Sequence, residues 1–90
     1  MPTIRLDQTL RRFAGNLESI KAEGSTVAEV LNSIKNEHPE LNMKLYDSGG
    51  NLQKWLTIWV DQENIRFMDD LATKVNASSD VYFLLGGSGG

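Results

Sequence analysis

The amino-acid sequence predicts an α+β fold in which one main helix packs across a mixed sheet of four to five strands. Three observations support this prediction: an amphipathic helix between residues 24 and 41, an alternating strand between residues 54 and 60, and an almost wholly apolar strand at residues 81–85. The chain has 90 residues, of which 40% are hydrophobic, and this size and composition fit a single globular domain.

The first segment predicts an antiparallel hairpin. Thr3–Asp7 alternates apolar and polar residues, which is the period of a half-buried strand. Gly15 and Asn16 then predict a turn, and Leu17–Ala22 predicts a second, weaker strand. Two strands separated by a short break favour a hairpin at the start of the fold.

The main helix has a start signal, an apolar stripe and a stop signal. Thr26 followed by Glu29 predicts a capping box, in which hydroxyl and carboxylate satisfy orphan backbone amides. Pro39 disfavours helical geometry at His38, so the helix should end there. A short helix or turn should follow over residues 41–46. The apolar stripe at helical spacing consists of Val27, Val30, Leu31 and Ile34.

The segment "KWLTIWV" predicts a strand with two unlike faces. One face carries Leu56, Ile58 and Val60. The other face carries Trp55, Thr57 and Trp59. The helix could cover either face, but the aliphatic set matches the aliphatic helix stripe better. We therefore expect the tryptophan face to point outward and to form a protein-binding patch, because tryptophan is enriched at interface hot spots.

The remaining segments complete the predicted sheet. Asp61–Asn64 predicts a tight turn, Ile65–Phe67 a short return strand, and residues 68–80 a loop with one buried turn around Leu71. Val81–Leu85 should be a central strand buried on both faces. If this last strand lies beside the first, the arrangement is a β-grasp domain over residues 1–85.

The chemistry-bearing residues do not predict an active site, a bound cofactor or a metal site. The absence of cysteine excludes a disulfide scaffold, a thiolate metal site and a cysteine nucleophile. His38 is the only histidine, and its place at a helix end fits a surface role or an interaction with the helix dipole. Asp69 and Asp70 are adjacent, so their side chains should diverge rather than form an acid–base pair. We expect a protein that is not itself an enzyme.

Charge and hydropathy indicate which classes of partner and which cellular location to expect. The net charge is −3, and lysine and arginine are scattered rather than gathered on one face, so no nucleic-acid partner is predicted. The start "MPTIRLD" has no apolar signal core, and no apolar run is long enough to span a bilayer. The expected location is the cytoplasm, without a membrane partner.

The last five residues are unlike the strand before them. A glycine run costs entropy to order, so it does not extend a strand. Its composition fits a linker or an expression scar, or a flexible tail that threads a narrow channel into a partner's active site. A terminal carboxylate is ionised near neutral pH and is a poor electrophile, so it would need activation by a partner that binds ATP and magnesium. The tail consists of Gly86, Gly87, Ser88, Gly89 and Gly90.

The end "VYFLLGGSGG" and the segment "NLQKWLTIWVDQENIRF" together resemble the ubiquitin-like sulfur-carrier proteins. This family includes the carriers of molybdopterin synthase, of thiamine synthesis and of thiocarboxylate-dependent cysteine synthesis. The middle segment is most similar to the cysteine-synthesis type, with its aromatic-rich strand, acidic turn and Arg-Phe pair. The family's proline-bearing tail is replaced here by Leu85-Gly86-Gly87-Ser88.

The resemblance implies a carrier that cycles between partner enzymes. An E1-like enzyme would adenylate the Gly90 carboxylate, and a sulfur donor would convert it to a thiocarboxylate. Gly89, which has no side chain, would let the end of the tail enter a narrow active site. Gly86, Gly87 and Ser88 would make the tail long enough to reach that site. The thiocarboxylate would deliver sulfide to a synthase, in the cysteine branch a pyridoxal-phosphate (PLP) enzyme, and a JAMM-type metalloprotease would trim the product.

Two alternatives remain open from the sequence. The chain could be a ubiquitin-like modifier joined to partner lysines through Gly90, since conjugation needs the same adenylation. It could also be a β-grasp binding module whose glycine tail has no role. The acceptor, the activating enzyme and the sulfur-containing product are not specified by any motif.

Overall fold

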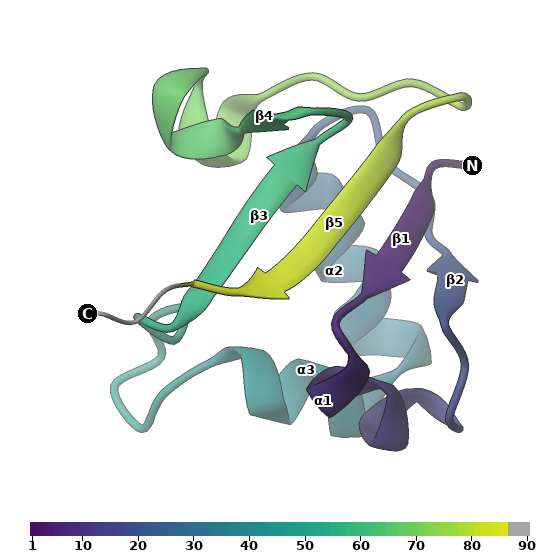
Figure 1. The fold of residues 1–90 in the computed structure, drawn as a ribbon, viewed down its shortest axis with the longest axis vertical. Coiled ribbons are helices and arrows are strands. Elements are labelled where there is room, and N and C mark those ends of the chain that lie inside the picture. The colour runs from purple at the N-terminus through teal and green to yellow at the C-terminus, as the bar shows by residue number, and fades with distance from the viewer. Residues whose placement is uncertain (87–90) are drawn as a thin grey trace.

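The computed structural model describes residues 1–86, which form a five-stranded mixed sheet with helices packed on one face (Figure 1). The strands are β1 (Thr3–Leu6), β2 (Ser19–Lys21), β3 (Leu56–Val60), β4 (Glu63–Asn64) and β5 (Asp80–Leu85). The helices are α1 (Gln8–Arg11), α2 (Val27–Glu37) and α3 (Pro39–Leu45). Three short 3₁₀ helices are η1 (Arg12–Ala14), η2 (Ile65–Phe67) and η3 (Asp70–Ala72).

The sheet has the strand order β2-β1-β5-β3-β4, so the last strand lies in the middle. β5 runs parallel to β1, with Val81 opposite Ile4, and antiparallel to β3, with Phe83 opposite Ile58. α2 crosses behind these strands (Figure 1). The predicted β-grasp fold is therefore confirmed, including the placement of the last strand beside the first.

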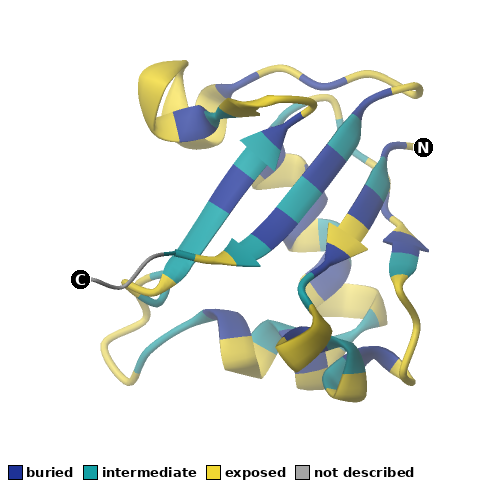
Figure 2. Ribbon diagram, in the orientation of Figure 1, coloured by how far each residue is buried: buried dark blue, intermediate teal, exposed yellow. Residues whose placement is uncertain are grey.

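The core lies between α2, α3 and one face of the sheet. Along β5 the side chains of Val81 and Phe83 are fully buried, whereas Tyr82 and Leu84 are half-buried (Figure 2). The prediction that this strand is buried on both faces is wrong, because no helix within residues 1–86 covers the other face of the sheet (Figure 1). An apolar run alone does not distinguish a strand covered on both faces from one covered on a single face.

The start of α2 differs from the predicted capping box in one partner. The Thr26 hydroxyl accepts a hydrogen bond from the Glu29 amide at 3.2 Å, as expected for an N-cap residue. The Glu29 carboxylate accepts from the amide and hydroxyl of Ser25, one residue before the predicted partner. These bonds from Ser25, the amide first, lower the pKa of Glu29.

The first segment contains more structure than a hairpin. β1 and β2 do pair antiparallel, with Ile4 opposite Ile20, but α1 and η1 fill the connection between them. Asp7 begins α1 by accepting a hydrogen bond from the Thr9 amide. Leu10 is thereby buried, so this connection adds to the core instead of crossing the surface.

The segment after β3 also differs from expectation. The return strand is Glu63–Asn64, and Ile65–Phe67 is a 3₁₀ helix because the Asn64 side chain accepts from the Arg66 amide and bends the chain. Leu71 is 40% exposed, and the buried residues of this loop are Thr73, Val75 and Ser79. None of the helices within residues 1–86 is long and apolar enough to cross a membrane.

Candidate functional site at the end of the central strand

The predicted tail begins where β5 ends, and Gly86 is its one described residue. The predicted covalent site Gly90, together with Gly89, Ser88 and Gly87, lies outside the described residues. We call Leu85 and Gly86, with the groups that bind them, the tail root. Its geometry defines where and in which direction the tail leaves the domain.

Asp7 holds one side of the tail root. Its backbone amide donates to the Phe83 carbonyl at 2.9 Å, and its Oδ2 accepts from the Leu85 amide at 3.2 Å. Its Oδ1 accepts from the amide and hydroxyl of Thr9, both at 3.1 Å. The Thr9 amide, and then the Leu85 amide and the Arg11 charge, lower the pKa of Asp7 against the opposing effect of burial. One carboxylate thus joins the start of α1 to the end of β5.

Gly86 lies against β3 on the other side of the tail root. Its amide donates to the Trp55 carbonyl. A Cβ atom at this position would lie 2.6 Å from Thr57 Cγ2, closer than such atoms can approach. Thr57 cannot easily rotate away, because its hydroxyl donates to the Leu84 carbonyl and accepts from Trp59 Nε1, both at 3.1 Å. Glycine is therefore required at residue 86 for close packing.

Substitution of Gly86→Ala should break the hydrogen bond between residue 86 and the Trp55 carbonyl. We expect amide exchange at residue 86 to accelerate by about tenfold. Adding Thr57→Ser should restore slow exchange, because serine keeps the hydroxyl and removes the clashing methyl group. Exchange measured by NMR on the single and double variants tests this, and an equally slow amide in Gly86→Ala alone would contradict it.

Substitution of Asp7→Asn should release the Leu85 amide while keeping the helix cap, because an amide side chain has only one acceptor oxygen. We expect protection of the Leu85 amide to fall about tenfold at neutral pH. In the wild-type protein the folded pKa of Asp7 lies below 3.8, so its contribution is complete above that pH and is lost as the pH falls through the folded pKa. Protection measured against pH should show this acid loss in the wild type and not in the variant.

The predicted aromatic face divides into two surfaces. Within β3 the alternation holds, since Ile58 and Val60 are buried and Thr57 and Trp59 lie half-buried on the uncovered face. There Trp59 lies opposite Tyr82, and Thr57 opposite Leu84. We call these four residues the outer face.

Trp55 does not continue the outer face as the sequence predicted. It precedes β3 in a turn, is 36% exposed, and belongs to a recess under the end of β5. The recess is lined by Thr9, Leu10, Phe13, Lys44, Trp55 and Leu85. The tail root therefore leaves the domain between the outer face and this recess. The prediction failed here because strand alternation does not extend into the preceding turn.

The other candidate groups do not converge on an active site. Among residues 1–86 no cluster of three or more histidine, aspartate or glutamate side chains could hold a metal ion. His38 ends α2 and begins α3, which matches its predicted place at a helix end. Sequence reasoning missed Asp7, although an acidic residue directly after a strand and before helix-forming residues is a recognisable helix-start signal.

Comparisons with known proteins identify the same fold in carriers and modifiers. Sulfur carrier protein CysO of Mycobacterium tuberculosis is 29% identical over 90 residues, covering 98% of this chain and 97% of the relative. Its crystal structure superposes with a TM-score of 0.85 at 27% identity, covering 97% of this chain and 100% of that chain. The solution structure of small archaeal modifier protein 1 (SAMP1) from Methanosarcina acetivorans gives a TM-score of 0.84 at 26% identity, covering 99% and 95%.

A further solved structure is evidence for the shared fold only. A chain of the crystal structure of the Amycolatopsis orientalis BexX/CysO complex gives a TM-score of 0.85 at 24% identity, with both chains fully covered. The model of the ThiS family matches residues 4–90, which includes nearly the whole chain and the final Gly-Gly. The chain therefore belongs to the ThiS family of ubiquitin-like sulfur carriers.

Proposed function

We propose that this protein carries sulfur as a thiocarboxylate on Gly90 for the synthesis of cysteine or a related sulfur metabolite. An E1-like enzyme transfers the adenylyl group of ATP to the Gly90 carboxylate and releases pyrophosphate. A sulfur donor then displaces AMP and leaves the thiocarboxylate. The carrier has no catalytic role of its own; ATP and magnesium bind to the activating partner.

The full-length relationship to CysO is the observation that carries this proposal, because 98% of this chain aligns with a sulfur carrier. The tail root agrees with it physically. The Asp7 and Trp55 hydrogen bonds hold Leu85 and Gly86 to the sheet, and the glycines that follow have no side chain to obstruct entry into a narrow channel. The acceptor would be held by a synthase, for which a PLP-dependent cysteine synthase is the leading candidate, with a JAMM-type metalloprotease releasing the product.

Intact mass spectrometry tests the proposal directly. The protein is incubated with an E1-like enzyme of a CysO relative, ATP, magnesium and a sulfide source, and an identical reaction without ATP serves as control. The expected result is an ATP-dependent mass gain equal to the exchange of one oxygen for sulfur. No gain with an enzyme that activates its own carrier in parallel would contradict the proposal.

A second candidate function is protein modification, which the likeness to SAMP1 favours. In that case the activated Gly90 carbonyl forms an isopeptide bond with a lysine of another protein. Peptide mapping of a cell extract supplied with ATP distinguishes the two functions. A carrier should yield the thiocarboxylate without conjugates. A modifier should yield, after digestion with trypsin, lysines that carry residues 75–90 of this chain, because Lys74 is its last basic residue.

Substitution of Trp59→Ala should weaken recognition by the activating enzyme. Trp59 is half-buried on the outer face beside Tyr82, where truncation of a large aromatic contact costs about 2 kcal/mol, or about 30-fold in KM. Met43→Ala is the matched control, because Met43 is 75% exposed on α3, outside the outer face. Steady-state kinetics should show the KM change for Trp59→Ala only; equal KM values would remove the outer face from the interface.

A further inference from the structure

The recess under the end of β5 is a separate surface from the outer face. It has a volume of about 270 Å³ and is bounded by Leu85 from β5, by Trp55 from the turn before β3, and by Phe13 and Lys44 from the helices. Small-molecule sites usually measure about 300–1,000 Å³, so this recess better fits one or two side chains of a protein. Leu85 is 45% exposed and Trp55 is 36% exposed at its edge, which leaves apolar surface available beside the tail root.

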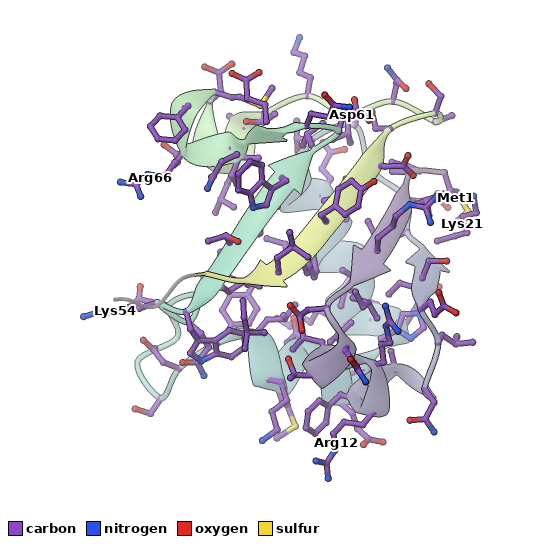
Figure 3. All side chains as sticks on the ribbon, in the orientation of Figure 1. Met1, Arg12, Lys21, Lys54, Asp61 and Arg66 are labelled. Carbon is purple, nitrogen blue, oxygen red and sulfur yellow. The ribbon has the colours of Figure 1, made fainter. Side chains whose placement is uncertain are left out.

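Two cations, Lys44 and Arg12, lie beside the recess on a protein whose net charge is −3. The Asp7 carboxylate also lies beside it, but both of its oxygens already accept hydrogen bonds from the lining residues Thr9 and Leu85. The Lys44 ammonium lies 4.9 Å from the centre of the Phe13 ring, and the Arg12 guanidinium lies 5.3 Å from it. Neither cation has a carboxylate within 4.0 Å among residues 1–86, where the one ion pair joins Arg5 and Asp80. Figure 3 shows Lys54 near the end of β5 and Arg12 at the bottom of the view, both away from Asp61 at the top.

We propose that this recess is a second docking surface, which receives an apolar side chain from an acidic segment of a partner enzyme. The proposal rests on the sulfur-carrier function, in which one tail must enter the sites of at least two enzymes. Two surfaces on opposite sides of the tail root allow different partners to hold the domain while the same tail enters each active site. The apolar walls bind the side chain, and Lys44 and Arg12 pair with carboxylates that flank it.

Titration of the full-length, isotope-labelled protein with defined peptides tests this surface by NMR. The probe is an acetylated peptide of sequence Glu-Glu-Phe-Leu-Glu. Two matched peptides replace its glutamates by lysines or its Phe-Leu pair by alanines. We expect the first peptide to shift the Trp55 indole and the Leu85 amide, and we expect the other two peptides to leave both unchanged.

A charge-reversing variant distinguishes binding at the recess from non-specific electrostatic attraction of the peptide. Lys44→Glu should weaken binding of the acidic peptide by about tenfold. Lys35→Glu makes the same change of charge on an exposed position of α2 and should leave binding unchanged. Equal weakening by both variants, shifts confined to other residues, or equally tight binding of the lysine peptide would each overturn the proposal.

The result is independent of the sulfur chemistry, because no tail reaction takes place in the titration. Peptide binding at the recess combined with no thiocarboxylate formation would retain the surface and reject the proposed function. Thiocarboxylate formation combined with no peptide binding would retain the function and reject the surface.

Discussion

Deletion of Gly90 should abolish thiocarboxylate formation completely while the thermal midpoint of the domain stays unchanged. The reacting carboxylate would then belong to Gly89, one residue nearer the domain, and the backbone reach would be shorter by about 3.3–3.6 Å. Catalysis requires reacting atoms within about 3–3.5 Å, so a displacement of this size removes the carboxylate from the adenylation site. Within residues 1–86 the last strand ends at Leu85 and the buried core extends to Phe83, so we expect stability not to change.

Ser88→Ala is the control for this deletion, because it alters the tail composition but keeps its length and its Gly-Gly end. Intact mass spectrometry should detect the sulfur-for-oxygen gain in Ser88→Ala and in the wild type but not in the deletion. Calorimetry on the same three proteins checks the second half of the prediction. A deletion that still gains sulfur would mean that Gly90 is not the activated residue.

Substitution of Phe83→Ala should produce the largest loss of stability among single core truncations. Phe83 is fully buried at the centre of β5, opposite Leu6 on one side and Ile58 on the other. Removing a buried phenylalanine side chain usually costs about 3–5 kcal/mol, through lost transfer free energy and the cavity that remains. In a domain of this size each kcal/mol lowers Tm by about 4–8 °C, so Tm should fall by more than about 12 °C.

Leu84→Ala provides the matched comparison one residue further along the same strand. Leu84 points to the outer face and is half-buried, so its truncation should cost only about 1 kcal/mol. Urea unfolding of the two variants measures the difference. Equal costs would contradict the assignment of β5 as a strand buried on one face.

The parts of the fold that the sequence predicted correctly are those in which periodicity and capping act locally. The stripe on α2 and the alternation from Thr57 to Val60 both match the observed burial. Two of the errors fall where a single side chain redirects the backbone. Asp7 starts α1 where only a short break between strands was predicted, and Asn64 starts η2 where a return strand was predicted. In both cases the side chain accepts a hydrogen bond from the amide two residues further along.

The tail root was only partly predictable for a related reason. The sequence identified Gly86 as part of the tail, but its close contact with Thr57 Cγ2 depends on the pairing of β3 with β5. The hydrogen bond from the Leu85 amide to the Asp7 carboxylate joins residues 78 positions apart in the sequence. No local sequence pattern predicts a contact over such a separation. Trp55 was assigned to the wrong surface because β3 begins only at Leu56, one residue after it.

The central position of β5 also determines when the domain can fold during synthesis. β1 and β3 do not pair with each other; each pairs with β5, which is made after both. The two halves of the sheet therefore stay separate until the ribosome has released residues 80–85, because long-range pairing cannot precede the strand that supplies it. An enzyme that recognises the folded surface would consequently bind only chains whose synthesis has passed the tail root, and unfinished chains would not be activated.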